Sequence, residues 1–473
     1  MDLNLKMMPI NCYKLQTSIS QNIFRAYDIR GIVYETLIPD IVYTIGRAFG
    51  SQALKDNEKT VIIARDGRIS GPELIQALQA GLMDSGCDVI DIGMVPTPVL
   101  YFATHLLSAR SGIMLTGSHN PPEYNGLKMI LAGKTLADQD IQKLYHGIIN
   151  KDFVTGSGQL KQIQIHDKYI QRITSDIKLS RPLKIVIDAG NGVAGQIAAQ
   201  LFRQLGCDVI ELFCDIDGSF PHHHPDPSDE KNLQDLINTV EQHHADIGLA
   251  FDGDGDRLGI ITNRGEIILS DRLLLLFAKD ILQRHKNAEI IFDVKCSRHL
   301  QSYIEQHGGK PLMWKTGHSL IKAKMQETGA LLAGEMSGHI FFKERWYGFD
   351  DGLYAAARLL EIVAHQKRTS SEIFAELPDS INTPELKLPV TEEKKWAVLD
   401  LLKKRAFFID ADINVIDGIR VDYEDGWGLI RASNTTPNLI LRFEADSYAS
   451  LERIQKIFKQ QLLNIDEELS LPF

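Results

Sequence analysis

LKIVIDAGNGVAGQIAAQLFRQLGCDVI, residues 183–210, holds the pattern that decides the fold. An apolar strand ends at Asp188, a helix-length stretch follows, and Gly206 precedes a second apolar strand that begins at Asp208. A glycine in this place ends a helix, because it adopts the left-handed conformation without steric cost. Strand, helix and strand at this spacing predict a βαβ unit, in which the strands lie parallel and the helix covers one face.

The same pattern occurs twice more in the chain. One apolar strand ends at Asp66 and is followed by Gly86, and another ends at Asp293 and is followed by Gly308. The gaps from aspartate to glycine are 20, 18 and 15 residues, and each has room for one helix of ordinary length. We therefore expect an α/β protein with three related α/β domains, whose sheets are mixed but mainly parallel.

The last part of the chain breaks this pattern. Its apolar spacing predicts helices at 391–405 and 447–462, with strands at 418–423, 427–432 and 439–444. These elements indicate a smaller C-terminal α+β domain. A length of 473 residues fits three or four domains. The predicted domains are 1–163, 164–266, 267–378 and 379–473.

The composition is that of a folded, acidic protein. Lys plus Arg number 51 against 62 Asp plus Glu, which gives a formal charge of −11, and 44% of residues are apolar. This charge argues against a nucleic-acid partner, which requires clustered basic residues. The apolar run at 273–278 has six residues, whereas a membrane span takes about 20, so we expect no membrane partner.

The N-terminus and the cysteines bear on the compartment. Residues 1–16 lack a basic segment followed by an apolar core, so we expect no signal peptide. The five cysteines are sparse, odd in number and free of a Cys-x-x-Cys pair, which favours neither a disulfide framework nor a zinc site. These observations predict a cytoplasmic protein.

Three aspartates alternate with glycines directly after the apolar run 247–251, namely Asp252, Asp254 and Asp256. Such a loop can surround one hard cation, and its charges would repel each other strongly without one. An EF-hand is excluded because Asn263 stands where that loop needs a glutamate. Mg²⁺ is favoured because a phosphate oxygen can complete its shell, and Arg257 is placed to hold that phosphate. A solvated acidic turn is the alternative.

The stretch TGSHNPP, residues 116–122, follows the apolar strand 112–115 and places Ser118 on a loop stiffened by glycine and proline. It is not a hydrolase elbow, because Thr116 and Asn120 stand where that motif has glycines. Nor does His119, as a sequence neighbour, by itself predict a dyad with Ser118. Lys128 is a candidate for acid–base work or phosphate contact. The alternatives are a rigid structural turn and an ordinary solvated lysine.

Two further loops concentrate polar groups. In GEMSGH, Glu335 and Ser337 suit a sugar diol, and His339 could exchange a proton near neutral pH. In RASNTTP, which begins at Arg431, the guanidinium, hydroxyls and amide suit a phosphate dianion. A polar surface turn would explain either loop taken alone.

The glycines from Gly190 to Gly195 match the dinucleotide-binding pattern G-x-G-x-x-G, with Glu211 about where an acidic residue would hold a ribose. The same glycines would also serve a tight strand-to-helix turn with close packing. Both interpretations stay open for this motif by itself. A dehydrogenase would, however, explain none of the other loops.

Taken together and in this order, the four loops resemble those of the α-D-phosphohexomutase superfamily, and most closely its bacterial phosphomannomutase/phosphoglucomutase branch. The resemblance runs from FRAYDIRG at 24–31 to the C-terminal residues 471–473. Met336 is typical of that branch, whereas phosphoglucosamine mutases usually carry Gln there. Leu127 replaces an aromatic residue that often precedes the lysine, and about the first 20 residues lie outside the match.

The resemblance implies a Mg²⁺-dependent isomerase that interconverts the 1- and 6-phosphates of mannose and glucose, and so supplies nucleotide-sugar precursors. Its cofactors would be Mg²⁺ and hexose 1,6-bisphosphate, its partners small phosphosugars, and its state a cytoplasmic monomer. Ser118 would carry the phosphoryl group, and a phosphoserine oxygen would join the three aspartates on the metal. The implied catalytic residues are Ser118, His119, Lys128, Arg257 and His339.

The resemblance also implies which residues bind the substrate in a central cleft. The sugar would contact Tyr27, Arg30, Lys295, His318 and the loop residues Glu335, Met336, Ser337, Gly338 and His339. The phosphate that does not react would contact Arg431, Ala432, Ser433, Asn434 and Thr435. Three other hypotheses remain: a phosphoglucosamine mutase, a dinucleotide-binding oxidoreductase and a phosphosugar sensor without turnover.

Overall fold

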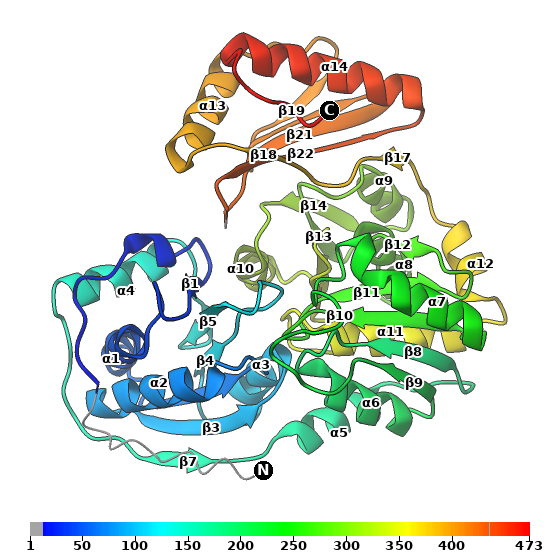
Figure 1. The fold of residues 1–473 in the computed structure, drawn as a ribbon. Helices are drawn as coiled ribbons and strands as arrows, with labels where there is room; N and C mark the ends of the chain where they lie inside the picture. Colours follow the sequence, from blue (N-terminus) through cyan, green and yellow to red (C-terminus); the bar gives the residue numbers. More distant parts are fainter. Residues whose placement is uncertain (1–12, 435) are drawn as a thin grey trace. The chain divides into compact units, whose positions relative to one another are not determined.

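A computed structural model describes residues 13–434 and 436–473 of the chain. The chain divides into two compact units. The first runs to Ile267 and takes in Arg345–Ser370, and the second comprises Ile268–Glu344 and Ser371–Phe473. Figure 1 shows the strands of four sheets with helices packed on them, and each unit is built around two of these sheets.

The first sheet has the order β1-β5-β4-β2-β3-β7, with β6 beside β5. Along the run β4-β2-β3-β7 each strand is parallel to the next. Strand β5 pairs antiparallel with β1, β4 and β6. Its strands are β1 (Ile29–Ile32), β2 (Thr60–Arg65), β3 (Asp88–Met94), β4 (Ser111–Leu115), β5 (Tyr124–Leu131), β6 (Lys134–Thr135) and β7 (Leu160–Gln162). Its helices are η2 (Gln21–Ile23), α1 (Pro39–Lys55), α2 (Gly71–Ser85), α3 (Thr97–Leu106) and α4 (Gln139–Ile149).

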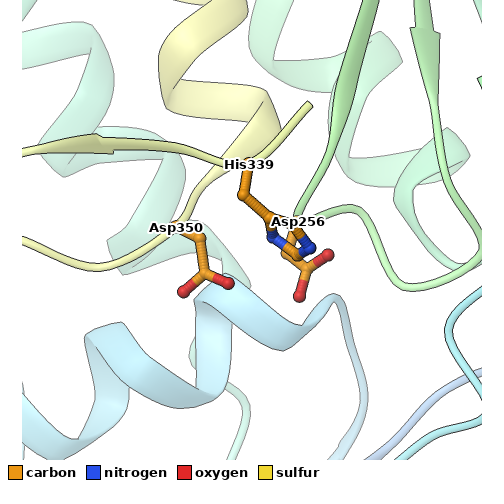
Figure 2. Close-up of side chains that lie close together, drawn as sticks. All are labelled: Asp256, His339 and Asp350. Atoms are coloured by element: carbon orange, nitrogen blue, oxygen red, sulfur yellow. The ribbon is translucent and has the colours of Figure 1, made fainter. Parts of the chain in front are cut away.

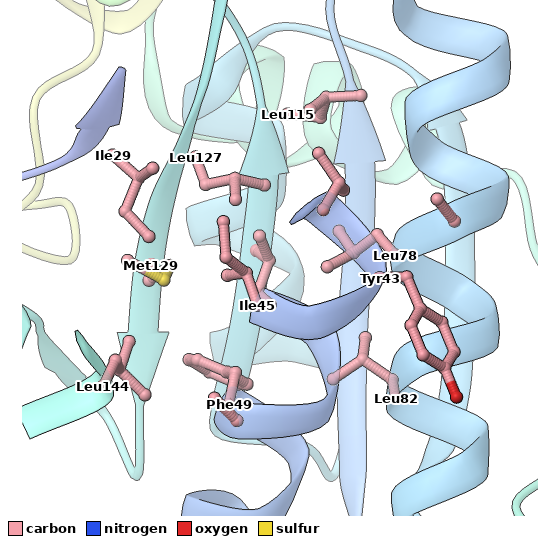
Figure 3. Close-up of a cluster of buried hydrophobic side chains, with 14 of the residues drawn as sticks. Ile29, Tyr43, Ile45, Phe49, Leu78, Leu82, Leu115, Leu127, Met129 and Leu144 are labelled. Carbon is pink, nitrogen blue, oxygen red and sulfur yellow. The ribbon is translucent and has the colours of Figure 1, made fainter. Parts of the chain in front are cut away.

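A buried apolar cluster joins this sheet to its helices (Figure 3). Ile45 and Phe49 of α1 and Leu78 of α2 are fully buried in it, together with Leu127 of β5. Burial of such side chains stabilises the fold by roughly 1.5–3 kcal/mol each. The packed cluster thus holds β5, which carries Lys128, at a fixed register against β4.

The second sheet has the order β12-β11-β10-β8-β9. β10, β8 and β9 are parallel, and β11 returns antiparallel beside β10. Its strands are β8 (Lys184–Asp188), β9 (Asp208–Leu212), β10 (Ile247–Phe251), β11 (Leu258–Thr262) and β12 (Ile267–Ile268). The helices of this part are α5 (His166–Asp176), α6 (Ala194–Gln204), η3 (Glu230–Leu233), α7 (Gln234–His243) and α11 (Gly352–Ala364), which packs on β10 and β11.

The third sheet, in the second unit, has the order β14-β13-β15-β16. Its first three strands are parallel and β16 is antiparallel to β15. The strands are β13 (Glu289–Asp293), β14 (Lys310–Trp314), β15 (Leu332–Gly334) and β16 (Ile340–Phe342). The helices are α8 (Ser270–Arg284), α9 (His299–Gln306) and α10 (His318–Thr328), and the short α12 (Ser370–Ala375) follows where the first unit ends.

The fourth sheet is antiparallel throughout, with the order β17-β22-β21-β20-β19 and β18 also beside β22. Its strands are β17 (Ile381–Asn382), β18 (Leu386–Pro389), β19 (Asp412–Asn414), β20 (Ile419–Tyr423), β21 (Gly426–Ala432) and β22 (Asn438–Ala445). Helices α13 (Glu392–Arg405) and α14 (Tyr448–Ile465) pack on this sheet around a shared apolar cluster.

The predicted fold class is confirmed. Each of the three repeats forms strand, helix and parallel strand, and its glycine stands in the left-handed region, with φ of 102° at Gly86, 92° at Gly206 and 82° at Gly308. The C-terminal part is α+β as predicted. Among the described residues, no helix combines the length and the apolarity that crossing a membrane would take.

Candidate active site

Three of the four polar loops occupy equivalent places in their sheets. In each of the first three sheets the loop joins the last parallel strand to the antiparallel strand beside it, at β4–β5, β10–β11 and β15–β16. The fourth loop joins the antiparallel strands β21 and β22. Each loop thus starts from a buried strand, which gives it a fixed base.

Ser118 lies in the β4–β5 loop, and its side chain points to the aspartate loop 252–256 that follows β10. It is 2% exposed and has a φ of 48°, a left-handed conformation that costs a serine backbone energy. Its Oγ donates to Asp252 Oδ2 at 2.9 Å and lies 3.2 Å from His119 Nδ1. The two neighbours are therefore in contact, which their adjacency in sequence did not predict.

A buried ion pair that the sequence analysis did not single out holds this loop in place. Arg68, whose side chain is fully buried, donates to the carbonyls of Ser118 at 2.8 Å, Asn120 at 2.6 Å, Pro121 at 2.5 Å and Tyr124 at 3.0 Å. Its partner Asp66 accepts from Thr116 Oγ1 and from the Gly117 amide. Because both residues follow β2, that strand's end supports the neighbouring loop. The strand-end motif Arg-Asp-Gly-Arg, residues 65–68, indicates a turn, but it does not report the contacts of Arg68 with the serine loop.

The aspartate loop after β10 is pressed against the serine loop. A Cβ on Gly253 would come within 2.4 Å of the Ser118 carbonyl oxygen, so only glycine fits there. The side chains of Asp252, Asp254 and Asp256 are fully buried, and their carboxylate oxygens lie within 4.8 Å of one another. Thr97, the first residue of α3, donates from Oγ1 to Asp254 Oδ2 at 2.5 Å.

The charges of this loop are balanced in part by Lys128. Its Nζ is 2.7 Å from Asp254 Oδ2 and also contacts Asp256. Burial alone would lower the pKa of Lys128, but the adjacent carboxylates outweigh it and raise that pKa above its ordinary value. Burial and the neighbouring carboxylates raise the pKa of Asp252 well above its usual range. The loop therefore has more carboxylates than one lysine can stabilise.

These residues fit a hard divalent cation. Three carboxylates offer oxygen ligands, which Mg²⁺ prefers, and Asp254 Oδ1 is buried without a hydrogen-bond partner among the described residues. An ion at this place would also relieve the repulsion that raises the pKa of Asp252. Ser118 Oγ, at 2.9 Å from Asp252, adjoins the same ligands.

Three further basic groups of the first unit surround Ser118. Arg257 Nε lies 3.8 Å from Asp252 Oδ2, and the acidic groups Asp252 and Asp226 raise the pKa of Arg257 against the effect of burial. Arg30 of β1 donates to the Gly117 carbonyl at 2.6 Å. Burial and then Arg257 lower the pKa of His119 well below its usual range, which leaves a neutral imidazole at pH 7. Tyr27, half-buried, precedes β1.

Asp350, which precedes α11, adds a carboxylate that the sequence analysis did not select. It is fully buried, and a carboxylate oxygen of Asp350 lies within 4.8 Å of one on Asp256 (Figure 2). Both residues belong to the first unit although they are far apart in sequence. The segment Arg345–Ser370 thus contributes a further carboxylate, that of Asp350, to the same site.

The second unit holds the other predicted residues, beginning with those for the sugar. Glu335 is 2% exposed and its Oε1 accepts from the Gly317 amide at 2.6 Å, one residue before His318 opens α10. His339 stacks on His318 with ring centroids 5.4 Å apart. Burial raises the pKa of Glu335, with His339 opposing the shift. Between them, Met336 and Ser337 are half-buried and Gly338 is buried.

The phosphate-type loop follows β21 in the same unit. Arg431 and Ala432 end that strand, Ser433 is buried and Asn434 is half-buried, whereas Thr435 lies outside the described residues. A buried ammonium that the sequence analysis missed supports the loop from α13: Lys395 Nζ donates to the Ser433 carbonyl at 2.8 Å. Lys295, after β13, contacts Glu385 in this unit.

The glycines of the dinucleotide-type motif pack closely instead of leaving room around them. A Cβ on Gly192 would come within 2.9 Å of the Gly253 backbone, and one on Gly195 within 2.4 Å of the Cys214 carbonyl. Glu211 pairs with Arg203 at 2.5 Å. Close packing of the strand-to-helix turn therefore accounts for these glycines.

Family models match the chain along most of its length. They describe phosphoglucomutase/phosphomannomutase alpha/beta/alpha domain I at 21–155, domain II at 167–265, domain III at 269–381 and the C-terminal domain at 385–461.

Named relatives cover nearly the whole chain. A Pseudomonas putida protein named phosphomannomutase/phosphoglucomutase is 56% identical over 456 residues, 96% of this chain and 98% of that one. A Neisseria meningitidis phosphoglucomutase is 55% identical, over 93% and 97% of the two chains. The crystal structure of a Burkholderia thailandensis phosphoglucomutase/phosphomannomutase family protein matches with a TM-score of 0.92 and 54% identity, over 96% of this chain and all of that one.

Metal binding should be measurable as stabilisation. We expect millimolar Mg²⁺ to raise the melting temperature over that in EDTA, because a ligand bound only by the folded state stabilises it by mass action. Asp254→Asn should remove this shift, since it removes one ligand charge. Asp188→Asn, which changes a buried aspartate of the neighbouring strand paired with His223, should keep it. An equal shift in the Asp254 variant would contradict the assignment.

Proposed function

The chain belongs to the phosphoglucomutase/phosphomannomutase family and is an isomerase, and we propose that it interconverts the 1- and 6-phosphates of glucose and mannose. The observation that carries this proposal is the contact of Ser118 Oγ with Asp252, inside a group of three buried carboxylates that Lys128 partly neutralises. A rigid, buried hydroxyl next to a metal-type site suits a phosphoryl carrier.

In the first half-reaction, phosphorylated Ser118 is the donor. The bond from phosphorus to Ser118 Oγ breaks while a bond forms to the free hydroxyl at the other end of the sugar phosphate. That hydroxyl gives up its proton, and the product is a hexose 1,6-bisphosphate. In the second half-reaction the bisphosphate lies in the reverse orientation and returns its original phosphate to Ser118. The net result moves a phosphate between carbons 1 and 6.

Positive charge for this transfer comes from Lys128 and Arg257, which phosphoryl transfer needs because negative charge spreads over the moving group. Bound Mg²⁺, held by Asp252, Asp254 and Asp256 with an oxygen of phosphorylated Ser118, would supply further positive charge at the phosphate. His119, Lys128 and His339 are the candidates for accepting the hydroxyl proton.

We propose the following residues for substrate binding. Glu335 and Ser337 would bind the sugar 3- and 4-hydroxyls, which roughly exchange places when the sugar turns over, with Met336, Gly338, Tyr27, Arg30, Lys295 and His318 around the ring. Arg431, Ala432, Ser433, Asn434 and Thr435 would bind the phosphate that does not react. We also propose four domains, at 1–163, 164–266, 267–378 and 379–473. The enzyme would be a cytoplasmic monomer whose cofactors are Mg²⁺ and hexose 1,6-bisphosphate.

A coupled assay tests the function. Glucose 1-phosphate, mannose 1-phosphate and glucosamine 1-phosphate would each be supplied with Mg²⁺ or with EDTA, plus a trace of hexose 1,6-bisphosphate. We expect turnover of the glucose and mannose substrates that depends on Mg²⁺. Turnover of the amino sugar alone would instead indicate a phosphoglucosamine mutase, and no turnover of any substrate would contradict the proposal.

A further inference from the structure

The arginine proposed for phosphate binding already has an anionic partner in the second unit. Arg431 has a side chain only 5% exposed, and its Nε donates to Asp417 Oδ2 at 3.0 Å. Asp417 lies just before β20, and β20 pairs antiparallel with β21, which ends beyond Arg431. A charged hydrogen bond of this kind is stronger than one between neutral groups.

The backbone is built for this close approach. Gly418, next to Asp417, has a φ of 84°, a conformation that other residues adopt only with strain. A Cβ there would come within 2.2 Å of the Ile430 carbonyl oxygen and within 2.6 Å of Arg431 Cβ. Glycine at 418 thus lets the chain bring the Asp417 carboxylate directly against Arg431.

Asp417 also connects this arginine to the residues proposed to bind the sugar. The same Oδ2 accepts from the Thr316 amide at 3.0 Å. The next amide, that of Gly317, donates to Glu335 at 2.6 Å, and His318 follows at the start of α10. One carboxylate oxygen therefore connects the loop at 316–318 with the phosphate-type loop after β21.

A second pair repeats the arrangement. Lys295 has a side chain 6% exposed and forms an ion pair with Glu385, between β17 and β18. Burial would raise the pKa of Glu385, but Lys295 outweighs it and lowers that pKa to about 2, so the pair is ionised at neutral pH. Lys295 Nζ also lies 3.9 Å from Asp293 Oδ2, so carboxylates already neutralise both cations. A dianion gains little attraction from a cation in that state.

We propose that Asp417 and Glu385 are internal counter-ions that occupy Arg431 and Lys295 in the empty enzyme and give way to the phosphate of the substrate. The proposal rests on the proposed function, because the same two cations then serve the phosphosugar. Asp417 is a positioning residue: it keeps Arg431 oriented and holds the 316–318 loop until phosphate replaces it. When phosphate displaces Asp417 from Arg431, the hydrogen bond from the Thr316 amide to Asp417 is also disturbed. Phosphate binding therefore affects the position of the residues proposed to contact the sugar.

The test measures binding of inorganic phosphate, without turnover, by equilibrium dialysis of labelled phosphate. Asp417→Asn should bind phosphate at least about fivefold more tightly than the wild type, as expected when a unit charge beside a buried arginine is removed. Glu385→Gln should also bind phosphate more tightly than the wild type, and it provides a second test if the Asp417 variant does not fold. In an Arg431→Gln background the gain from Asp417→Asn should disappear.

The matched control is Asp425→Asn, which removes a carboxylate of the β20–β21 turn that pairs with the exposed Arg453 of α14, and it should leave phosphate affinity unchanged. Unchanged or weaker phosphate binding in both Asp417→Asn and Glu385→Gln would overturn the proposal, because a carboxylate that only supports its cation loses affinity when neutralised. The substrate KM of Asp417→Asn should be lower than that of the wild type, because the variant binds phosphate more tightly. Because the binding measurement involves no sugar, failure of the wild type to turn over phosphosugars would contradict the proposed function separately.

Discussion

Replacing Ser118 with alanine should lower kcat by at least about 10³-fold, because loss of the group that forms the covalent intermediate leaves only binding and charge stabilisation. Ser118 Oγ is the hydroxyl oxygen in contact with both Asp252 and His119. The measurement is the coupled assay with hexose 1,6-bisphosphate present. Incubation with labelled bisphosphate should label the wild-type protein and leave Ser118→Ala unlabelled.

A matched control separates loss of the carrier from general damage. Ser157→Ala changes an exposed serine of the same unit and should keep both turnover and labelling. The melting temperature of Ser118→Ala should stay near that of the wild type, since alanine removes only one hydroxyl. Turnover of Ser118→Ala at the wild-type rate would refute the covalent mechanism and leave the family assignment intact.

Replacing Arg68 with methionine should reduce both stability and kcat. The change leaves the carbonyls of Ser118, Asn120, Pro121 and Tyr124 without their buried donor and leaves the Asp66 carboxylate without its partner. Removal of one partner from a buried ion pair typically lowers the free energy of unfolding by about 3–5 kcal/mol. We expect a melting temperature lower by roughly 5–15 °C. Because the loop then shifts, kcat should fall by at least about tenfold.

Arg65→Met is the comparison, because Arg65 stands at the same strand end but donates to the Asp66 carbonyl and not to the serine loop. It should cost no more than about 1.5 kcal/mol, the ordinary range for one hydrogen bond. Calorimetric melting and steady-state kinetics of both variants provide the measurement. If Arg68→Met kept wild-type kcat at a temperature where it is fully folded, the loop would not depend on this support.

Several features of the fold could be predicted from sequence because they are encoded locally. The strands ending at Asp66, Asp188 and Asp293 and the glycines after their helices follow from apolar spacing and left-handed glycine, which involve only near neighbours. The antiparallel strands β5, β11 and β16 were not predicted. Their place depends on pairing with a strand already in the sheet, and the residues near each strand in sequence do not report that pairing.

The site divides in the same way. Ser118, the aspartates from Asp252 and the loop from Arg431 could be selected by composition, since phosphate and metal chemistry require particular side chains close together in sequence. Arg68, Lys395 and Asp417 could not be selected, because each acts through contacts with a distant segment. Arg68, for example, reaches a carbonyl 50 residues away, and nothing near it in sequence reports that contact.

The sequence by itself therefore determined the kind of fold, the loops that carry the chemistry and the charges available in each loop, because these depend on residue type and short-range spacing. The tertiary structure decided which of these groups meet. Ser118 and Asp252 are 134 residues apart, and only the packing of the β4–β5 and β10–β11 loops, with glycine at 253, brings their side chains to 2.9 Å. The pairing of Arg431 with Asp417 likewise depends on strand register and on the close approach at Gly418, which are properties of the folded sheet.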